Sequence, residues 1–285
     1  MLDAMLRELL MKWKVGCQLD YNLAGLTTFV FNIAIAGDRH QRCLEEQIRL
    51  TPAEPLEEHC DARGNRYWRV SSAAEHLTVT YEATAVSAPL EGDPASLTTL
   101  PVASLPMDVL PYLYPSRYCQ SDRLMTLARR EFGAIAQGYE QVQALCEWIY
   151  HHVAYQGGST DVHTSACDTL LERRGVCRDF AHLAIALCRA LEIPARFVSV
   201  YAHDLNPPDF HACFEVYLGD RWYVFDATRL APRQGFIRIA TGRDAADVAF
   251  CTLFGPGQMT NLQIWADCLE SNPALHDDPK RAIAL

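Results

Sequence analysis

The spacing of apolar residues changes near residue 100 of this 285-residue chain. Before that point apolar side chains occupy alternate positions, as in HLTVTYEATAV at 76–86 and FVFNIAIA at 29–36. A period of two is typical of a strand with one buried face. Beyond it, apolar residues recur at three and four positions, which is typical of helices. The pattern predicts an α+β protein with a β-rich, sandwich-like domain at 1–100 and a mixed domain at 101–285.

Shorter signals complete the N-terminal half. DARGN at 61–65 predicts a turn between strands, and the proline-containing stretch at 87–106 has no periodicity, which indicates a linker. The domain boundary is therefore expected between residues 95 and 110. The opening segment, 1–15, is either a short helix or an extension ahead of a true start at Met11, and the sequence does not separate these.

In the C-terminal half, segments with the apolar spacing of helices are followed by segments with the alternation of strands. Ser121 is expected to cap the first helix. A proline at 194 bounds the last one. Helices are predicted at 122–132, 139–152 and 177–191, and strands at 196–202, 211–219 and 221–228. The tail beyond Asn272 is weakly patterned, and there is no internal repeat.

Charge and hydropathy argue against a nucleic-acid binder and against a membrane-spanning protein. The net charge is -10, and the 25 Lys and Arg residues are scattered, whereas a nucleic-acid binder needs a basic surface. No run approaches the roughly 18 apolar residues of a membrane-spanning helix. The first ten residues lack the apolar core and cleavage site of a secretory signal. We expect a cytoplasmic protein with neither nucleic-acid nor membrane partners.

The eleven cysteines are odd in number and widely scattered. They form no CxxC pair and no Cys/His cluster at zinc spacing, which argues against a zinc or redox protein. This usage fits a reducing compartment in which most thiols behave as small apolar residues. The sequence implies no metal and no cofactor.

One cysteine differs from the others in its position. Cys177 begins the apolar-periodic stretch 177–191, and Gly175 stands just ahead of it in RRGVCRDF. Unpaired N–H groups and partial positive charge at a helix start stabilise a thiolate. A glycine there would let the chain turn sharply and let a substrate carbonyl approach, with the N–H of Cys177 facing the developing oxyanion. Taken alone, a cysteine at a helix start is more often inert packing.

Two further residues share one face of a predicted hairpin. In HACFEVYLGDRWYVFDAT, alternation places His211 and Cys213 on the face opposite the apolar one. If Gly219 and Asp220 form the loop, Asp226 lies opposite Cys213 and diagonal to His211; if the loop slips back by one residue, Asp226 faces His211 directly. Both registers keep histidine and aspartate on one face.

The three residues fit a Cys/His/Asp triad. In such a triad the imidazole takes the thiol proton, and the carboxylate fixes its tautomer and stabilises the imidazolium. Each residue also has an ordinary explanation, because His211 could be a polar edge residue and Asp226 a turn former. Their joint occurrence with Cys177 favours the triad.

The text GVCRDFAHLAIALCRALEIPAR, then HACFEVY and WYVFDAT, resembles the bacterial transglutaminase-like superfamily, whose core is a papain-like cysteine-hydrolase fold. The resemblance implies that Cys177 is the nucleophile, His211 the base and Asp226 the orienting acid. It extends to the β-patterned first hundred residues, through the DxxGN turn and the HLTVT strand, and to TGRDAADVAF at 241–250.

The chain departs from the family pattern at Cys213, where tryptophan is common. This thiol would line the site, alter access for an acyl acceptor or pair with the nucleophile on oxidation, although a smaller side chain filling the same wall is the simpler interpretation. Tyr155 is a candidate second oxyanion donor, with a stacked core tyrosine as the alternative. Arg243 and Asp244 are candidates for bracing the cleft, or an ordinary surface pair. Asp179 suits the first helical turn.

These observations predict cysteine-dependent attack on a peptide or glutamine-type amide through a thioester, in a transglutaminase-like cysteine protease or amidase. Hydrolysis is favoured mildly over transfer to an amine, because water is always present and the sequence shows no sign of a pocket for an amine. Protein-glutamine transglutaminase activity and a noncatalytic peptide-binding module on the same fold are the alternatives. The expected partner is a peptide or protein substrate; its identity, the oligomeric state and the role of the β domain stay open.

Overall fold

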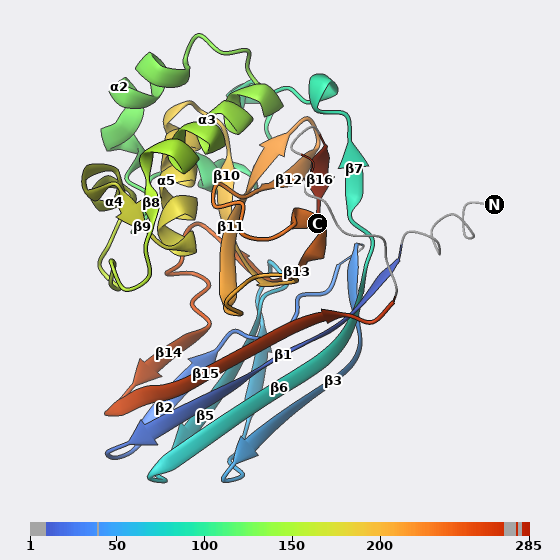
Figure 1. Cartoon of the computed structure of the whole chain (residues 1–285), viewed down its shortest axis with the longest axis vertical. Coiled ribbons are helices and arrows are strands. Elements are labelled where there is room, and N and C mark those ends of the chain that lie inside the picture. The colour runs from blue at the N-terminus through green and yellow to red at the C-terminus, as the bar shows by residue number, and fades with distance from the viewer. Residues whose placement is uncertain (1–9, 39, 271–277, 279–280) are drawn as a thin grey trace, which may run out of the picture.

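The computed structural model describes residues 10–38, 40–270, 278 and 281–285. It consists of a β-sandwich below a mixed α/β body, as Figure 1 shows, which confirms the α+β class. Of the opening segment, residues 1–9 lie outside the described part of the chain. Residues 11–15 belong to a strand, so the helical alternative for this stretch is wrong there.

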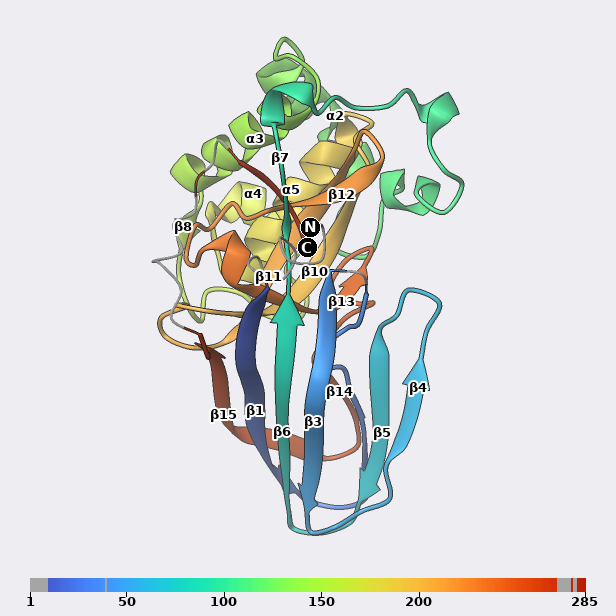
Figure 2. The same cartoon turned by 90° about the vertical axis from the view of Figure 1, so that its right-hand side faces the viewer.

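In the described part of the chain, the β-sandwich consists of eight strands in two sheets, six from the N-terminal part and two from residues 251–268. Their bounds are β1 Met11–Leu23, β2 Thr27–Phe31, β3 Gln41–Thr51, β4 Glu57–Cys60, β5 Arg66–Ser72, β6 His76–Ser87, β14 Cys251–Phe254 and β15 Gly257–Cys268. One antiparallel sheet has the order β15-β1-β6-β3 and the other the order β14-β2-β5-β4. Figure 2 shows the long strands of the first sheet side by side.

Alternating side chains of both sheets form the sandwich core. Strand β6 buries every second residue, as its sequence predicts. Aromatic rings meet between the sheets: the Tyr21 and Phe29 centroids lie 4.8 Å apart, and those of Trp68 and Tyr81 lie 5.4 Å apart. Tilted aromatic pairs of this kind add to the stabilisation that burial gives.

Each half of the chain contributes strands to the other. The C-terminal strands β14 and β15 complete the two sandwich sheets, β15 by pairing with β1. Conversely, the segment expected to be a plain linker contains β7, Leu90–Gly92, which pairs with β16, Ala282–Ala284, in the sheet of the other body. The chain therefore passes from the sandwich to the second body between β6 and β7, at residues 88–89, and returns after β13 to add β14 and β15 to the sandwich.

The second body packs helices against a six-stranded sheet of order β13-β10-β11-β12-β16-β7. The remaining elements are α2 Ser121–Phe132, α3 Tyr139–His152, β8 Ala154–Tyr155, α4 Ala166–Glu172, β9 Arg174–Gly175, α5 Cys177–Ala190, β10 Ala195–Ala202, β11 Phe210–Leu218, β12 Arg221–Phe225 and β13 Phe236–Gly242, with four short 3-10 turns. In the described part of the chain, no helix has the length and apolarity that crossing a membrane requires.

Helix α5 is the central element of this body. Every residue from Asp179 to Ala190 is buried, so the predicted apolar stripe has become a helix enclosed on all sides. Enclosure of α5 fixes the position of its first residue, Cys177. Helix α2 begins at Ser121 itself, with Gln120 in the cap position, and the predicted serine cap is wrong by one residue.

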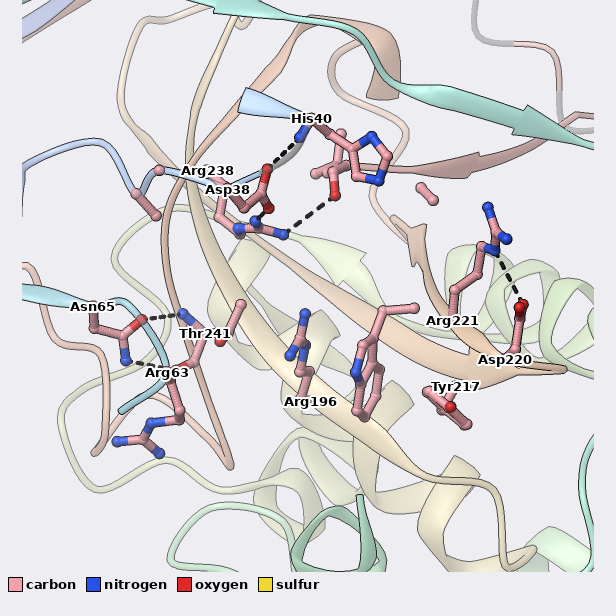
Figure 3. Close-up of a pocket in the computed structure, with 15 residues that line it drawn as sticks. Asp38, His40, Arg63, Asn65, Arg196, Tyr217, Asp220, Arg221, Arg238 and Thr241 are labelled. Atoms are coloured by element: carbon pink, nitrogen blue, oxygen red, sulfur yellow. Dashed lines mark hydrogen bonds and ion pairs between the residues drawn. The ribbon is translucent and has the colours of Figure 1, made fainter. Parts of the chain in front are cut away.

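Two buried amide side chains fasten the sandwich to the core. Asn65, at the end of the predicted turn, accepts from the Thr241 N–H at 2.9 Å and donates to the Thr241 carbonyl at 2.8 Å, as Figure 3 shows. Gln41 makes the equivalent pair of bonds to the backbone of Arg238, at 2.7 and 2.8 Å. Both amide side chains bind β13, which pairs with β10, and β10 pairs in turn with β11, the strand that carries His211.

A polar pocket of about 350 Å³ lies at this junction (Figure 3). Its floor includes Arg196 and Arg238, which share the fully buried carboxylate of Glu215, and Arg238 also pairs with Asp38. Glu215 stands four residues beyond His211 on β11, about 13 Å along the strand. The pocket is therefore separate from the predicted triad.

Candidate active site

The nucleophile candidate stands at a helix start that two short strands position. Strands β8 and β9 run parallel and pair Tyr155 with Gly175, two residues before Cys177. This pairing brings the Tyr155 hydroxyl into contact with both the backbone N–H and the thiol of Cys177. Tyr155 is 47% exposed and its ring lies against the buried Phe180, with 5.8 Å between the centroids, so it borders the core without being enclosed in it.

Asp179 ties the first turn of α5 together. Its Oδ2 accepts from the Val176 N–H at 2.9 Å and from the Thr160 hydroxyl at 2.8 Å, while Arg178 donates to Oδ1. The carboxylate is fully buried. It satisfies backbone groups that a helix start leaves unpaired, and this holds Cys177 in place. Asp179 therefore positions the helix start through hydrogen bonds, in addition to the favourable interaction with the helix dipole that the sequence indicates.

Gly175 is required for a different reason from the one expected. The backbone at this residue does not adopt a positive φ, so no glycine-only turn is present. Instead, a Cβ at this position would lie 2.7 Å from the Cβ of Asp179. The glycine allows β9 to approach the capping carboxylate closely.

The hairpin that carries the other two residues has the first of the predicted registers. Leu218 pairs with Arg221 across a Gly219–Asp220 loop, and the pairing runs back to Phe214 and Phe225. Asp226, the next residue, comes opposite Cys213. Gly219 has φ 62°, a conformation in which glycine is favoured and which closes this two-residue loop.

His211 and Asp226 form a buried pair. Nε2 of His211 lies 2.8 Å from Oδ2 of Asp226, and the two side chains are 1% and 2% exposed. Oδ1 of Asp226 accepts from the N–H and the hydroxyl of Thr228, each at 2.8 Å. The carboxylate is thus fixed on one side by Thr228 and fixes the imidazole on the other.

The electrostatics of the pair favour a charged imidazole. Burial alone would lower the pKa of His211, but Asp226 outweighs it, and together with Cys177 it raises that pKa to about 10. Burial likewise opposes the charge of Asp226, yet His211 and the bonds from Thr228 hold the pKa of this carboxyl below its usual value. The Nδ1 atom of His211 makes no protein hydrogen bond among the described residues, and the side chain of Cys177 interacts with the ring.

The structure therefore brings together the three residues that the sequence singled out. A thiol at a helix start, an imidazole and a buried carboxylate follow one another in the arrangement that nucleophilic acyl transfer uses. Cys213 lies beneath them, 1% exposed, and burial raises the pKa of its thiol well above the ordinary value. At this degree of burial it fills the wall behind the pair.

Arg243 and Asp244 lie elsewhere. Arg243 forms a surface pair with Asp247, at 3.0 Å from Nε to Oδ2. Asp244 is buried and accepts from the Tyr118 N–H at 2.9 Å. No hydrogen bond or ion pair of the described residues joins either one to the triad; they anchor the 241–250 segment beside α5, to which His182 also binds through the Ala245 N–H.

Sequence reasoning did not identify two of these supporting residues. Thr160 bonds to Asp179 from a loop without periodicity, so no local signal marks it. Thr228 stands two residues after Asp226, the spacing of a side chain that closes a turn on its own backbone, and this spacing could have been recognised.

Comparison with known proteins follows the same division of the chain. Residues 126–227 match the sequence profile of the Transglutaminase-like superfamily, and residues 11–108 match that of "Bacterial transglutaminase, N-terminal domain". A solved structure from Cytophaga hutchinsonii, described as a "putative cysteine protease", is 44% identical and superposes with a TM-score of 0.93, covering 96% of this chain and 97% of its own. The chain belongs to the transglutaminase-like superfamily.

The chain is also similar to mycobacterial proteins. The Mycobacterium leprae protein ML0607 is 27% identical over 228 residues, which are 75% of this chain and 81% of its own length. The Mycobacterium bovis protein Mb2599c is 28% identical over 271 residues, 83% and 85% of the two chains. The superfamily and the Cytophaga relative support a cysteine-based enzyme with a transglutaminase-like core behind a β-rich N-terminal region.

Proposed function

We propose that this protein is a cysteine hydrolase that cleaves an amide of a peptide or a glutamine side chain through the triad Cys177, His211 and Asp226. The observation that carries the proposal is the orientation of His211. Its Nε2 is held by Asp226 at 2.8 Å, while the remaining ring nitrogen accepts or donates no hydrogen bond among residues that the structure describes, and Cys177 interacts with the ring. An imidazole held in this way can exchange a proton with one group, the thiol.

In the resting pair the proton of Cys177 lies on His211, and in the first step the sulfur attacks the amide carbonyl carbon. The C–N bond of the tetrahedral adduct then breaks, and the amine or ammonia leaves with the proton from His211. In the second step, His211 deprotonates water, which attacks the thioester and releases the carboxylic acid and the thiol. Asp226 stabilises the imidazolium in both steps without being protonated.

Two donors are placed to stabilise the negative oxygen of the adduct. One is the backbone N–H of Cys177, at the positive end of α5. The other is the hydroxyl of Tyr155. Desolvation and the neighbouring Cys177 raise the pKa of Tyr155, so this hydroxyl stays protonated at neutral pH and can donate. Both donors lie next to the sulfur, and a carbonyl oxygen that accepts from them would replace the contact between the Tyr155 hydroxyl and the Cys177 N–H.

Alkylation by iodoacetamide, with mass spectrometry to locate the modified cysteine, tests the nucleophile. At pH 7 we expect Cys177 to react before Cys60, which is exposed and serves as an internal reference. In His211→Ala the Cys177 rate should fall about tenfold or more, because the thiolate loses its cationic partner. His76→Ala, an exposed histidine of β6, should leave the rate unchanged.

The result that contradicts the proposal is equal labelling of the two cysteines, independent of His211. That result would favour a noncatalytic peptide-binding module on the same fold. If Cys177 is activated, a glutamine-rich protein incubated with a fluorescent primary amine separates the two chemistries. Ammonia release without incorporation of the amine is expected for hydrolysis, whereas covalent incorporation would assign a transglutaminase.

A further inference from the structure

The pocket of about 350 Å³ between the sandwich and the second body is lined by arginines from several strands. Arg196 comes from β10, Arg221 from β12 and Arg238 from β13, and Figure 3 shows the three around one hollow. Tyr217 and Trp222 also line it, with their rings 5.3 Å apart in an edge-on contact. This volume lies at the lower end of the range for small-molecule sites, so the pocket has room for a small ligand.

The guanidinium of Arg196 is held on two of its sides. Its Nε and Nη2 both donate to Oε2 of Glu215, each at 2.6 Å. It also lies over the ring of Trp222, 4.3 Å from the centroid. Glu215 is fully buried, whereas Arg196 lines the pocket, so the guanidinium lies between this carboxylate and the hollow. An anion in the pocket would therefore be closer to the guanidinium than to Glu215.

One edge of the Arg196 guanidinium has no partner among the residues that the structure describes. Nε and Nη2 form the edge that binds Glu215, while Nη1 and the second N–H of Nη2 form the other edge. Figure 3 shows this guanidinium directed into the hollow. Two parallel N–H groups of this kind match the spacing of two oxygens of a carboxylate or a phosphate. The free edge of Arg196 is therefore a donor pair already positioned for an oxyanion.

Arg221 supplies a second positive charge on the pocket wall. It lies on the other side of the hollow from Asn65 and Thr241, as Figure 3 shows. Its Nε donates to Asp220 at 3.1 Å, and within the described part of the chain its two terminal nitrogens make no hydrogen bond. These terminal nitrogens are available to the same ligand.

The other two arginines of the wall are more fully compensated. Arg238 pairs with two carboxylates, those of Asp38 and Glu215, and donates to the Leu285 carbonyl at 3.4 Å. Arg63 pairs with two acidic side chains that do not line the pocket. Among the described residues, Arg196 and Arg221 have one acidic partner each. The ligand is therefore expected to contact these two arginines.

We propose that this pocket binds a small molecule through an oxyanion group, a carboxylate or a phosphate, which accepts two hydrogen bonds from the free edge of Arg196 and is attracted by Arg221. Tyr217 and Trp222 contact an apolar or aromatic part of the same ligand. The pocket is separate from Cys177, so this ligand is not the amide that the thiol attacks. The inference goes beyond the function proposed above and does not depend on it.

Three probes of similar size test the proposal: benzoate, phenyl phosphate and the neutral benzamide. The indole N–H signal of Trp222 in NMR, identified by its absence in Trp222→Phe, reports on the pocket. We expect this signal to shift saturably with benzoate or with phenyl phosphate, and not with benzamide. The anion with the lower Kd shows whether the site prefers a carboxylate or a phosphate, and saturation with either supports the proposal.

Substitutions of the two arginines locate the bound anion. In Arg196→Lys the Kd should rise about tenfold, because the ammonium keeps the charge and can still pair with Glu215 but has no parallel pair of N–H groups. In Arg221→Gln the Kd should rise about threefold, the effect of one partly exposed charge, and the difference should shrink in high salt. Arg69→Gln is the matched control, since Arg69 is an exposed arginine of β5 with one acidic partner, Glu57, and the Kd should stay unchanged.

Three results would overturn the proposal. The first is the lack of a saturable shift with either anion. The second is equal affinity for benzamide, because recognition would then depend on the aromatic ring alone. The third is an unchanged Kd in both Arg196→Lys and Arg221→Gln. The side chain of Arg221 is 41% exposed, so Arg221→Gln provides the test in a folded protein even if Arg196→Lys is destabilised by its contact with the buried Glu215.

Discussion

Gly175 and Asp179 approach so closely that a Cβ on residue 175 would lie 2.7 Å from the Asp179 Cβ and 3.1 Å from its Oδ2. A Cβ essentially never lies within 3.0 Å of a nonbonded heavy atom, so a side chain at residue 175 would force its surroundings to shift. The short strand β9 and the first turn of α5 are thus packed against each other through a glycine and a capping carboxylate. Cys177 lies between them in the sequence, so its position depends on this contact.

Gly175→Ala should destabilise the protein by about 1–3 kcal/mol, the usual cost of overpacking a tight site. It should also slow the alkylation of Cys177, since Asp179 must shift to accommodate the methyl group. Urea unfolding and iodoacetamide labelling measure the two effects. Gly157→Ala is the control, because nothing lies within 4 Å of a Cβ at that position in the adjoining loop. Equal effects of the two substitutions would contradict this account.

Asp179→Ala should cost about 2 kcal/mol, because it removes a helix cap and leaves the Val176 N–H without its partner. The loss should be accompanied by slower labelling of Cys177. Asp168 caps α4 with the same geometry, accepting from the Ser165 N–H at 2.9 Å. Asp168 is exposed, so Asp168→Ala should lower stability by less, about 1 kcal/mol, and leave labelling unchanged, which distinguishes local positioning from the loss of a helix cap in general.

The protonation of His211 can be followed by NMR of its imidazole. In the wild type it should titrate near pH 10, and in Asp226→Asn its pKa should fall below the ordinary 6.5, since burial then acts without its counter-charge. Cys177→Ala should lower the pKa by a smaller amount. A wild-type pKa near 6.5, unaffected by Asp226→Asn, would refute the ion pair.

The shifted pKa values of His211 and Asp226 also predict how the stability of the fold depends on pH. The folded-state pKa of His211 lies above its unfolded value, so the stability that protonated His211 contributes is complete below about pH 6.5 and is lost as the pH rises toward 10. The pKa of Asp226 is lowered, so its contribution holds above about pH 4 and is lost in acid. The stabilisation by the pair should therefore be largest between these limits.

The sequence was sufficient where a local pattern determines the structure. Alternation predicted β6 and β11, and the residues of the Gly219–Asp220 loop were compatible with two registers, of which the structure adopts the first. It placed His211 and Asp226 on one face because the face of a hairpin is a local property, whereas the grouping of Cys177 with them came from their joint occurrence and the resemblance to the superfamily.

What the sequence could not supply depends on distant contacts. Strand β15 lies at the edge of its sheet and is mostly half-exposed, so its sequence lacks the alternation that marks β6. The bond from Thr160 to Asp179 depends on how a loop folds over the helix start. Helix and strand propensities and the periodicity of apolar residues do not predict contacts of this kind.

The contact between the sandwich and the core gives the last prediction. Asn65 is 1% exposed and exchanges two hydrogen bonds with the backbone of Thr241, so Asn65→Ala leaves a buried N–H and a buried carbonyl unpaired. The expected cost is about 2–4 kcal/mol in urea unfolding. Asn22→Ala, an exposed asparagine of β1, is the control and should change stability by less than about 0.5 kcal/mol.

The substitution of Asn65 should affect the site as well. Because Asn65 holds β13, which pairs with β10 beside the strand of His211, Cys177 labelling should also slow in Asn65→Ala. If labelling keeps its wild-type rate while stability falls, the sandwich supports the fold without positioning the site.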